Sequence, residues 1–262
     1  ERITDPSSPF YEDLTISPLL SVEYIAFRSD VAPFDDPAIR QALALGFPRQ
    51  RVASVSLNGR VGEANGVVPD GMLGKDEWLV ESSPDLERAR QLISESSYGS
   101  AGNVPPITIY SAASLRATTF RDAIAENLGL RVDVVFVDWQ SFLNGLQNRE
   151  YPAYLLYWGA DFPDPESILL TLFGTDSADN YVEYSNSEFD GLLEQASREA
   201  DPEARIGFYA EANEVLMDDA VVIPLFYDVA YTLVKPWVQG IKMTPLGLLY
   251  LDSVSIAEEA GQ

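Results

Sequence analysis

The chain has 262 residues, and 17 Lys and Arg against 41 Asp and Glu give it a formal net charge of −24. This acidic surplus disfavours a nucleic-acid partner, while 46% hydrophobic and 22% charged residues are typical of a folded chain with one large or two small domains. Histidine and cysteine are absent, which excludes serine–histidine and cysteine–histidine catalysis and disfavours a zinc site.

The first elements follow from local patterns. Residues 1–18 contain three prolines without clear periodicity, so we expect a leader or connecting segment. The alternation of side chains over 21–27 predicts a strand. Asp36 and Pro37 predict the start of a helix over 38–45, because Asp is a favourable N-cap and Pro suits the first helical position. The next expected elements are a helix at 49–57, an irregular loop at 58–82 and a helix that starts at Ser83-Pro84.

Strand-like and helical segments alternate in the middle of the chain. They are a strand at 107–112, a helix from Ser114 to Leu128, a strand at 131–137, a helix capped by Asp138 and a strand at 153–158. Gly129 is expected at the C′ position of its helix. This order predicts an α/β fold in which some of the strands pair in parallel.

The last third of the chain is expected to be mostly helical before it returns to strand. One helix is expected after Glu166, with Ile168, Leu169, Leu172 and Phe173 as its apolar residues. A second is capped by Ser185 or Asn186, and a third runs from Asp201-Pro202 to about Met217. Two β-rich runs at 221–227 and 229–234 are expected to meet at a hinge at Asp228. Residues 235–262 are expected to form a looser tail.

An acidic loop at 161–166 follows the apolar strand at 153–158. Asp164 and Pro165 are expected to cap the next helix, whereas Asp161 lies too far from that helix to cap it. A carboxylate directly after a strand is where α/β folds place ligand contacts, so Asp161 is a candidate functional residue. A hydrolase that uses Asp161 and Asp164 as a carboxylate pair remains an alternative, although neighbours on one loop seldom face a bond from opposite sides.

Two of the four tryptophans follow expected strands closely. Trp139 and Trp158 stand at strand ends beside loops, whereas Trp78 and Trp237 carry no such signal. A large aromatic residue is usually part of the core. The position at strand ends instead indicates rings that line a cleft and are not fully buried.

The order of these local motifs resembles one family. The matching stretches are 24–27, 33–43, 66–72, 137–143, 158–165, 184–190, 201–209, 223–227 and 234–238, of which Trp158-Gly159-Ala160-Asp161-Phe162-Pro163-Asp164-Pro165 is the most specific. The chain thereby resembles the extracellular solute-binding proteins of ABC importers, in the oligopeptide, dipeptide and nickel class known as family 5. The resemblance extends over residues 19 to 240.

The resemblance implies a fold and a domain organisation. Members of the family are longer and begin with another lobe, so this chain is similar to the C-terminal half only. Residues 19–234 are then expected to form an α/β lobe of the type II periplasmic-binding-protein-like kind, with a mixed sheet flanked by helices. Residues 235–262 are expected to return toward the missing N-terminal lobe.

The resemblance also implies a function, which is capture of peptides between two lobes that close by a hinge motion and deliver the solute to a membrane permease. The protein would be no enzyme, would need neither metal nor cofactor, and would work in the periplasm or on the extracellular face of the membrane, secreted or held there by a lipid anchor on the missing N-terminus. A nickel chelate, a sugar or an opine is the alternative solute. A purely structural surface module is a further alternative.

Site residues follow from the resemblance in the same way. In peptide-binding members, the aspartate that matches Asp161 pairs with the α-ammonium group of the ligand. The arginine that helps to hold a ligand carboxylate in oligopeptide binders is replaced here by Leu155. The expected ligand-binding residues are Asp161, Trp139, Trp158, Phe162 and Tyr227, and no catalytic residue or metal ligand is expected.

Overall fold

A computed structural model describes residues 3–53, 61–72, 84–112 and 115–257. These residues form a six-stranded sheet in the order β2-β6-β1-β5-β3-β4. The strands are β1 (Leu14–Phe27), β2 (Gly62–Glu63), β3 (Ile107–Ser111), β4 (Val132–Phe136), β5 (Ala153–Gly159) and β6 (Val222–Leu233). β3 pairs in parallel with β4 and β5, whereas the other pairs are antiparallel. The expected α/β fold with a mixed sheet is confirmed.

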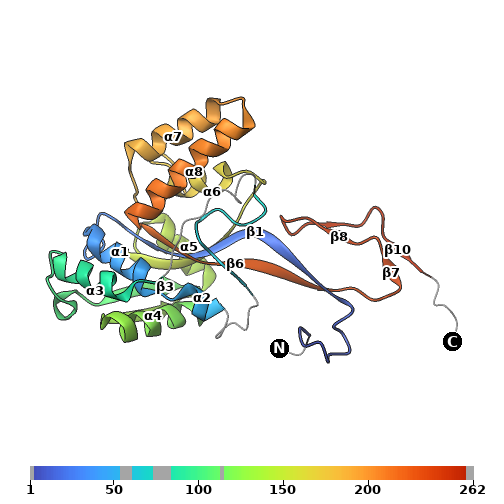
Figure 1. The fold of residues 1–262 in the computed structure, drawn as a ribbon, viewed down its shortest axis with the longest axis horizontal. Coiled ribbons are helices and arrows are strands. Elements are labelled where there is room, and N and C mark those ends of the chain that lie inside the picture. The colour runs from blue at the N-terminus through green and yellow to red at the C-terminus, as the bar shows by residue number, and fades with distance from the viewer. Residues whose placement is uncertain (1–2, 54–60, 73–83, 113–114, 258–262) are drawn as a thin grey trace.

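Helices cover both faces of this sheet. Successive side chains of a strand point to opposite faces, so a strand that is apolar throughout needs cover on both sides. On β1, Tyr24 and Ala26 belong to one buried cluster, and Ile25 and Phe27 belong to another. The first cluster is covered by α5 (Trp139–Gln147), α6 (Glu166–Phe173), α7 (Ser187–Arg198) and α8 (Pro202–Asp219). The second is covered by α1 (Pro37–Gly46), α3 (Leu86–Glu95) and α4 (Leu115–Leu128), while α2 is the short turn Arg49–Arg51 (Figure 1).

Several helices begin where the sequence predicts. The carboxylates of Asp36, Asp138 and Asp201 each accept a hydrogen bond from a backbone N–H in the first turn of the helix that follows. Asn186, one of the two alternatives, caps α7 in the same way. The start of α3 differs from the prediction: Asp85 is the cap, and Ser83 lies outside the described residues.

Two strands are longer than the sequence suggests. β1 begins at Leu14, so residues 14–18 of the expected connecting segment pair with the far end of β6. β6 is continuous through Asp228, which therefore is no hinge between two runs. The two strands extend together as a ribbon beyond the helices (Figure 1). Of the helix expected at 49–57, α2 is the first part, and residues 54–57 lie outside the described ranges.

The tail folds beside this ribbon as two small hairpin-like sheets. They consist of β7 (Val238–Gln239) with β10 (Ser255–Ile256) and β8 (Lys242–Met243) with β9 (Leu249–Tyr250). Pro245 O accepts a hydrogen bond of 2.7 Å from Leu20 N–H, which ties the tail to β1. Large apolar side chains are exposed on the segment before β1, on the ribbon and on the tail, namely Phe10, Tyr11, Ile16, Leu233, Trp237, Leu248, Leu249, Tyr250, Leu251 and Ile256.

Candidate ligand-binding site

Four of the five expected site residues, Trp139, Trp158, Asp161 and Phe162, lie at or just beyond one edge of the sheet. β3, β4 and β5 run in parallel, so their carboxyl ends lie at the same edge. The chain turns there from β4 through Asp138 into α5, and from β5 through the acidic loop into α6. Open α/β sheets commonly bind ligands at such an edge.

Asp161 presents an available carboxylate at this edge. The residue is exposed, and its backbone N–H donates a hydrogen bond of 2.9 Å to Ser167 Oγ at the start of α6. Within the described ranges, no hydrogen bond or ion pair holds the carboxylate itself. The backbone of Asp161 is therefore fixed while its charge remains accessible to a ligand.

Asp164, three residues further on, is engaged by the protein. Both of its carboxylate oxygens accept from the guanidinium of Arg205 on α8, at 2.6 and 3.1 Å. Oδ1 also accepts from the N–H of Glu166, which caps α6 as the sequence predicts. A bidentate ion pair of this kind neutralises the carboxylate, which argues against a hydrolytic pair formed by Asp161 and Asp164.

Aromatic side chains are present on the same segments that follow β4 and β5. Trp139, the first residue of α5, is 56% exposed, and Phe162 is 44% exposed. Trp158 is half-buried against the core, and its indole N–H is buried without a hydrogen-bond partner among the described residues. Neither Trp139 nor Trp158 is enclosed on all sides, as the sequence predicts for cleft-lining rings. Tyr157, which sequence analysis missed, is also 44% exposed.

Tyr227 and Leu155 lie in the interior instead. Tyr227 is 4% exposed, and its hydroxyl hydrogen-bonds to Asn65 Oδ1 at 3.1 Å and to Gly66 O at 2.9 Å. Burial raises the pKa of this phenol well above its ordinary value. In this structure Tyr227 anchors the loop at 65–66, and the register places it in the same row of the sheet as Val22 and Trp158. Leu155 packs into the core cluster with Ile25 and Phe27.

A charged cluster that sequence analysis missed joins the start of α4 to β1 and β6. Arg116 donates to Glu23 Oε2 at 2.7 Å and to Asp228 Oδ1 at 3.2 Å, and its guanidinium lies 5.5 Å from the centre of the Phe226 ring. Although burial lowers it, the pKa of Arg116 is raised overall by the carboxylates of Glu23 and Asp228. The sequence contained one signal for this cluster, because Arg116 stands at the start of the helix that follows the parallel strand β3.

The edge of β5 itself is open near its end. β3 pairs with β5 only opposite Tyr154 and Leu155. Ala160 N–H donates to Leu20 O at 2.8 Å, so the alternation of an antiparallel ladder points the backbone groups of Tyr157 and Gly159 away from β1. In the part of the chain that the structure describes, no strand pairs with these groups. We call them the open edge of β5.

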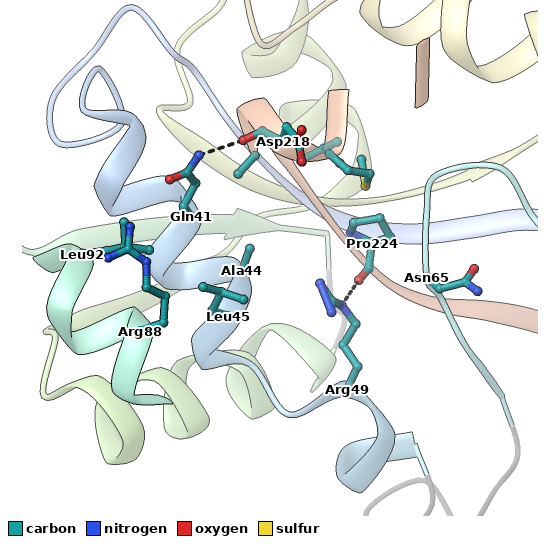
Figure 2. A pocket seen from close by; sticks show the side chains of 12 residues that line it. Gln41, Ala44, Leu45, Arg49, Asn65, Arg88, Leu92, Asp218 and Pro224 are labelled. Atoms are coloured by element: carbon teal, nitrogen blue, oxygen red, sulfur yellow. Dashed lines mark hydrogen bonds between the residues drawn. The ribbon is translucent and has the colours of Figure 1, made fainter. Parts of the chain in front are cut away.

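A separate cavity of about 240 Å³ lies between α1, α3, the end of α8 and β6 (Figure 2). Arg49 Nε donates to Pro224 O at 2.8 Å, and Gln41 Nε2 donates to Asp218 O at 3.0 Å in its wall. Burial lowers the pKa of Arg49 to about 10. The cavity shares no residue with the open edge of β5. Among the described residues, acidic side chains form no group of three or more that could hold a metal ion.

Comparison with known proteins identifies one family of solute-binding proteins. The model described as "Bacterial extracellular solute-binding proteins, family 5 Middle" matches residues 4–180. The chain is 28% identical over 253 residues to the periplasmic oligopeptide-binding protein OppA of Salmonella typhimurium, covering 93% of this chain and 46% of that protein. It is 26% identical over 244 residues to heme-binding protein A of Haemophilus influenzae, covering 90% of this chain and 45% of that protein.

Solved structures share the fold. The Escherichia coli murein tripeptide binding protein MppA matches with a TM-score of 0.80 and 24% identity, covering 94% of this chain and 50% of that one. The complex of Haemophilus influenzae OppA with the peptide RPPGFSPFR matches with a TM-score of 0.81 and 22% identity, at the same coverage. The chain thus spans about half the length of the curated relatives that it matches.

Proposed function

Because the chain belongs to the bacterial extracellular solute-binding proteins of family 5, we propose that it is the ligand-closing lobe of a two-lobe peptide-binding protein that serves an ABC importer. The resemblance noted in the sequence and the type II fold are both confirmed. In this proposal, residues 19–234 form the lobe, with the first part of β1 added at its start. Residues 235–262 return toward an N-terminal lobe.

The observation that carries the proposal is the exposed carboxylate of Asp161 next to the open edge of β5. An extended peptide can add to a sheet edge through its own backbone N–H and C=O groups, which every peptide has. Asp161 would hold the α-ammonium group at one end of that peptide. The exposed rings of Trp139 and Phe162 would contact side chains of varied shape.

The negative charge of Asp161, which is exposed and has no ion-pair partner among the described residues, favours the same orientation. A carboxylate enclosed in a closing cleft is costly without a cationic partner, and an ammonium group provides one. Leu155 is buried and apolar, so the ligand carboxylate must be held by other groups of the two lobes.

The exposed apolar side chains of the ribbon and the tail support a second lobe. Patches of this kind usually mark a surface that another part of the protein covers. Closure of two lobes about the ribbon of β1 and β6 would bury the ligand. The partner in transport is the membrane permease, and the site of action is the periplasm or the outer face of the cytoplasmic membrane, with or without a lipid anchor.

A non-peptide solute is the second candidate, because one relative is named a heme-binding protein. Nickel chelates, sugars and opines belong to the same alternative. Such solutes lack the ammonium group and the extended backbone that Asp161 and the open edge of β5 suit. We therefore favour peptides, and we assign the protein to binding and not to catalysis.

The experiment that separates these solutes is mass spectrometry of the two-lobe protein purified under non-denaturing conditions. We expect a mixture of short peptides to be released when the protein is denatured. A single non-peptide compound bound in equimolar amount would contradict the proposal. Turnover of released peptides by the same sample would contradict the assignment to binding alone.

A further inference from the structure

Tyr157 is an exposed aromatic residue that follows a buried run of β5. The residues from Ala153 to Leu156 are buried, whereas the Tyr157 side chain is 44% exposed. A large aromatic side chain is usually part of the core. Beside the open edge of β5, an exposed ring is instead available to a bound peptide.

The ring of Tyr157 extends along β5 over Gly159. A Cβ built on Gly159 would lie 3.9 Å from Tyr157 Oη and 4.0 Å from Tyr157 Cε1. Tyr157 and Gly159 are also the two residues whose backbone groups form the open edge. The ring therefore lies beside the backbone groups with which a peptide would pair.

A second exposed ring lies on the same face of the sheet. Tyr157 follows Leu155 by two residues, so both side chains point to the face that α1, α3 and α4 cover. Phe136, at the end of β4, shares a row with Ser111 and Leu155 and therefore points to this face as well. Its side chain is 48% exposed. Because β3 lies between β4 and β5, the two rings flank the path that continues beyond the end of β3.

The position of Asp161 sets the direction of a peptide on this path. Asp161 comes two residues after Gly159, so a peptide whose α-ammonium group is held there begins beyond the end of β5. It then runs back along β5, antiparallel to it. The outward backbone groups of β5 occur at every second residue, so the first peptide residue lies opposite Gly159 and the third lies opposite Tyr157.

We propose, on the basis of the peptide-binding function above, that Tyr157 and Phe136 form a subsite for a large apolar side chain at the third residue of the peptide. That side chain points to the same face as both rings, with Tyr157 directly opposite and Phe136 diagonally across on β4. Aromatic side chains on neighbouring strands stabilise a pair with another aromatic or β-branched side chain. The backbone contacts are common to all peptides, whereas these rings select among them.

The alternation of side chains along a strand provides an internal control. The second peptide residue points to the opposite face of the sheet, which is the face of Trp158. A change at Tyr157 therefore affects the recognition of the third residue and leaves that of the second unchanged.

The test uses the two-lobe protein and tetrapeptides with a free amino-terminus, in which one alanine at a time is replaced by phenylalanine. Calorimetry should show that phenylalanine at the third position binds about fivefold tighter than alanine. Tyr157→Ala should remove most of this gain. Any gain from phenylalanine at the second position should be the same in Tyr157→Ala and in the unmodified protein.

Three further variants locate the effect. Tyr157→Phe retains the ring and should retain the gain at the third position, which separates the ring from the hydroxyl group. Phe136→Ala should lower the same gain from the other side of the peptide. Leu170→Ala removes an exposed apolar side chain from α6, outside the subsite, and is the matched control. Because both rings are exposed, thermal unfolding of the variants should match that of the unmodified protein.

The outcomes separate the subsite from the function. Equal affinity for alanine and phenylalanine at the third position would overturn the subsite. A gain that survives both Tyr157→Ala and Phe136→Ala, or a loss that is equal at the second and third positions, would overturn it as well. Absence of peptide binding to the unmodified protein would instead overturn the proposed function.

Discussion

Asp161 and Asp164 lie on one loop, yet only Asp164 forms an ion pair among the described residues. Asp164 is held by both terminal nitrogens of Arg205 and caps α6. The Asp161 carboxylate has no such partner within the described residues, although the backbone of Asp161 is fixed by Ser167. The comparison shows that two carboxylates of one motif can have different roles. A carboxylate with an ion-pair partner within the protein stabilises the fold, whereas one without such a partner is available to a ligand.

The largest expected effect on stability comes from Asp164. Asp164→Ala removes a largely buried, bidentate partner of Arg205 and the cap of α6, so we expect a loss of about 2 kcal/mol in the free energy of unfolding. Asp161→Ala is the matched control and should change that free energy by less than about 0.5 kcal/mol. Urea unfolding of the chain measures both. Equal losses would remove the distinction between the two carboxylates.

A smaller effect is expected at Tyr227, which is buried in this structure. Tyr227→Phe deletes the hydroxyl that bonds Asn65 and Gly66, so unfolding should become easier by about 1 kcal/mol. Tyr157→Phe, at an exposed tyrosine, should have almost no effect on stability. If Tyr227→Phe were silent in urea unfolding but weakened peptide binding, Tyr227 would return to the ligand site.

The smallest of these effects concerns Asp36, another carboxylate engaged in folding. Although burial raises it, hydrogen bonds from Ser97 and Ala38 lower the pKa of Asp36 overall. Its stabilising contribution is therefore fully present above the ordinary pKa of about 3.9 and is lost as the pH falls through the lowered value.

Asp36→Ala should cost about 0.5 to 1 kcal/mol at pH 7, and the difference from the unmodified chain should shrink below about pH 4. Asp35→Ala, at the exposed neighbour, is the control and should show no such difference. Urea unfolding at a series of pH values measures the difference in the free energy of unfolding between each variant and the unmodified chain. A difference that grew on acidification would contradict the role of the charged cap.

Local signals predicted the helices well. Asp36, Asp138 and Asp201 cap helices within three residues along the chain, so the sequence alone contains the interaction. The exposed positions of Asp161 and Trp139 were also predictable, because both directly follow the end of a strand or its cap. Information about neighbours in the chain was sufficient in each case.

Long-range contacts explain what the sequence pattern missed. In the cluster of Glu23, Arg116 and Asp228, the partners of Arg116 are 93 and 112 positions away, so its place at the start of a helix does not identify them. The continuity of β6 depends on pairing with the first residues of β1, which looked like a connecting segment. The burial of Tyr227 likewise depends on the pairing of β6 with β1 and β2, which lie far from it in the chain.

The central claim is that Asp161 binds the α-ammonium group of a peptide. Its most direct test is calorimetry of the two-lobe protein, unmodified and Asp161→Ala, with a free peptide and its N-acetylated form. Loss of one member of an enclosed charge pair costs about 2 kcal/mol or more, so each change alone should weaken binding about 30-fold. Both changes together should weaken it no further, because they remove the same interaction. Equal affinity for free and acetylated peptides, with Asp161→Ala silent, would contradict the claim.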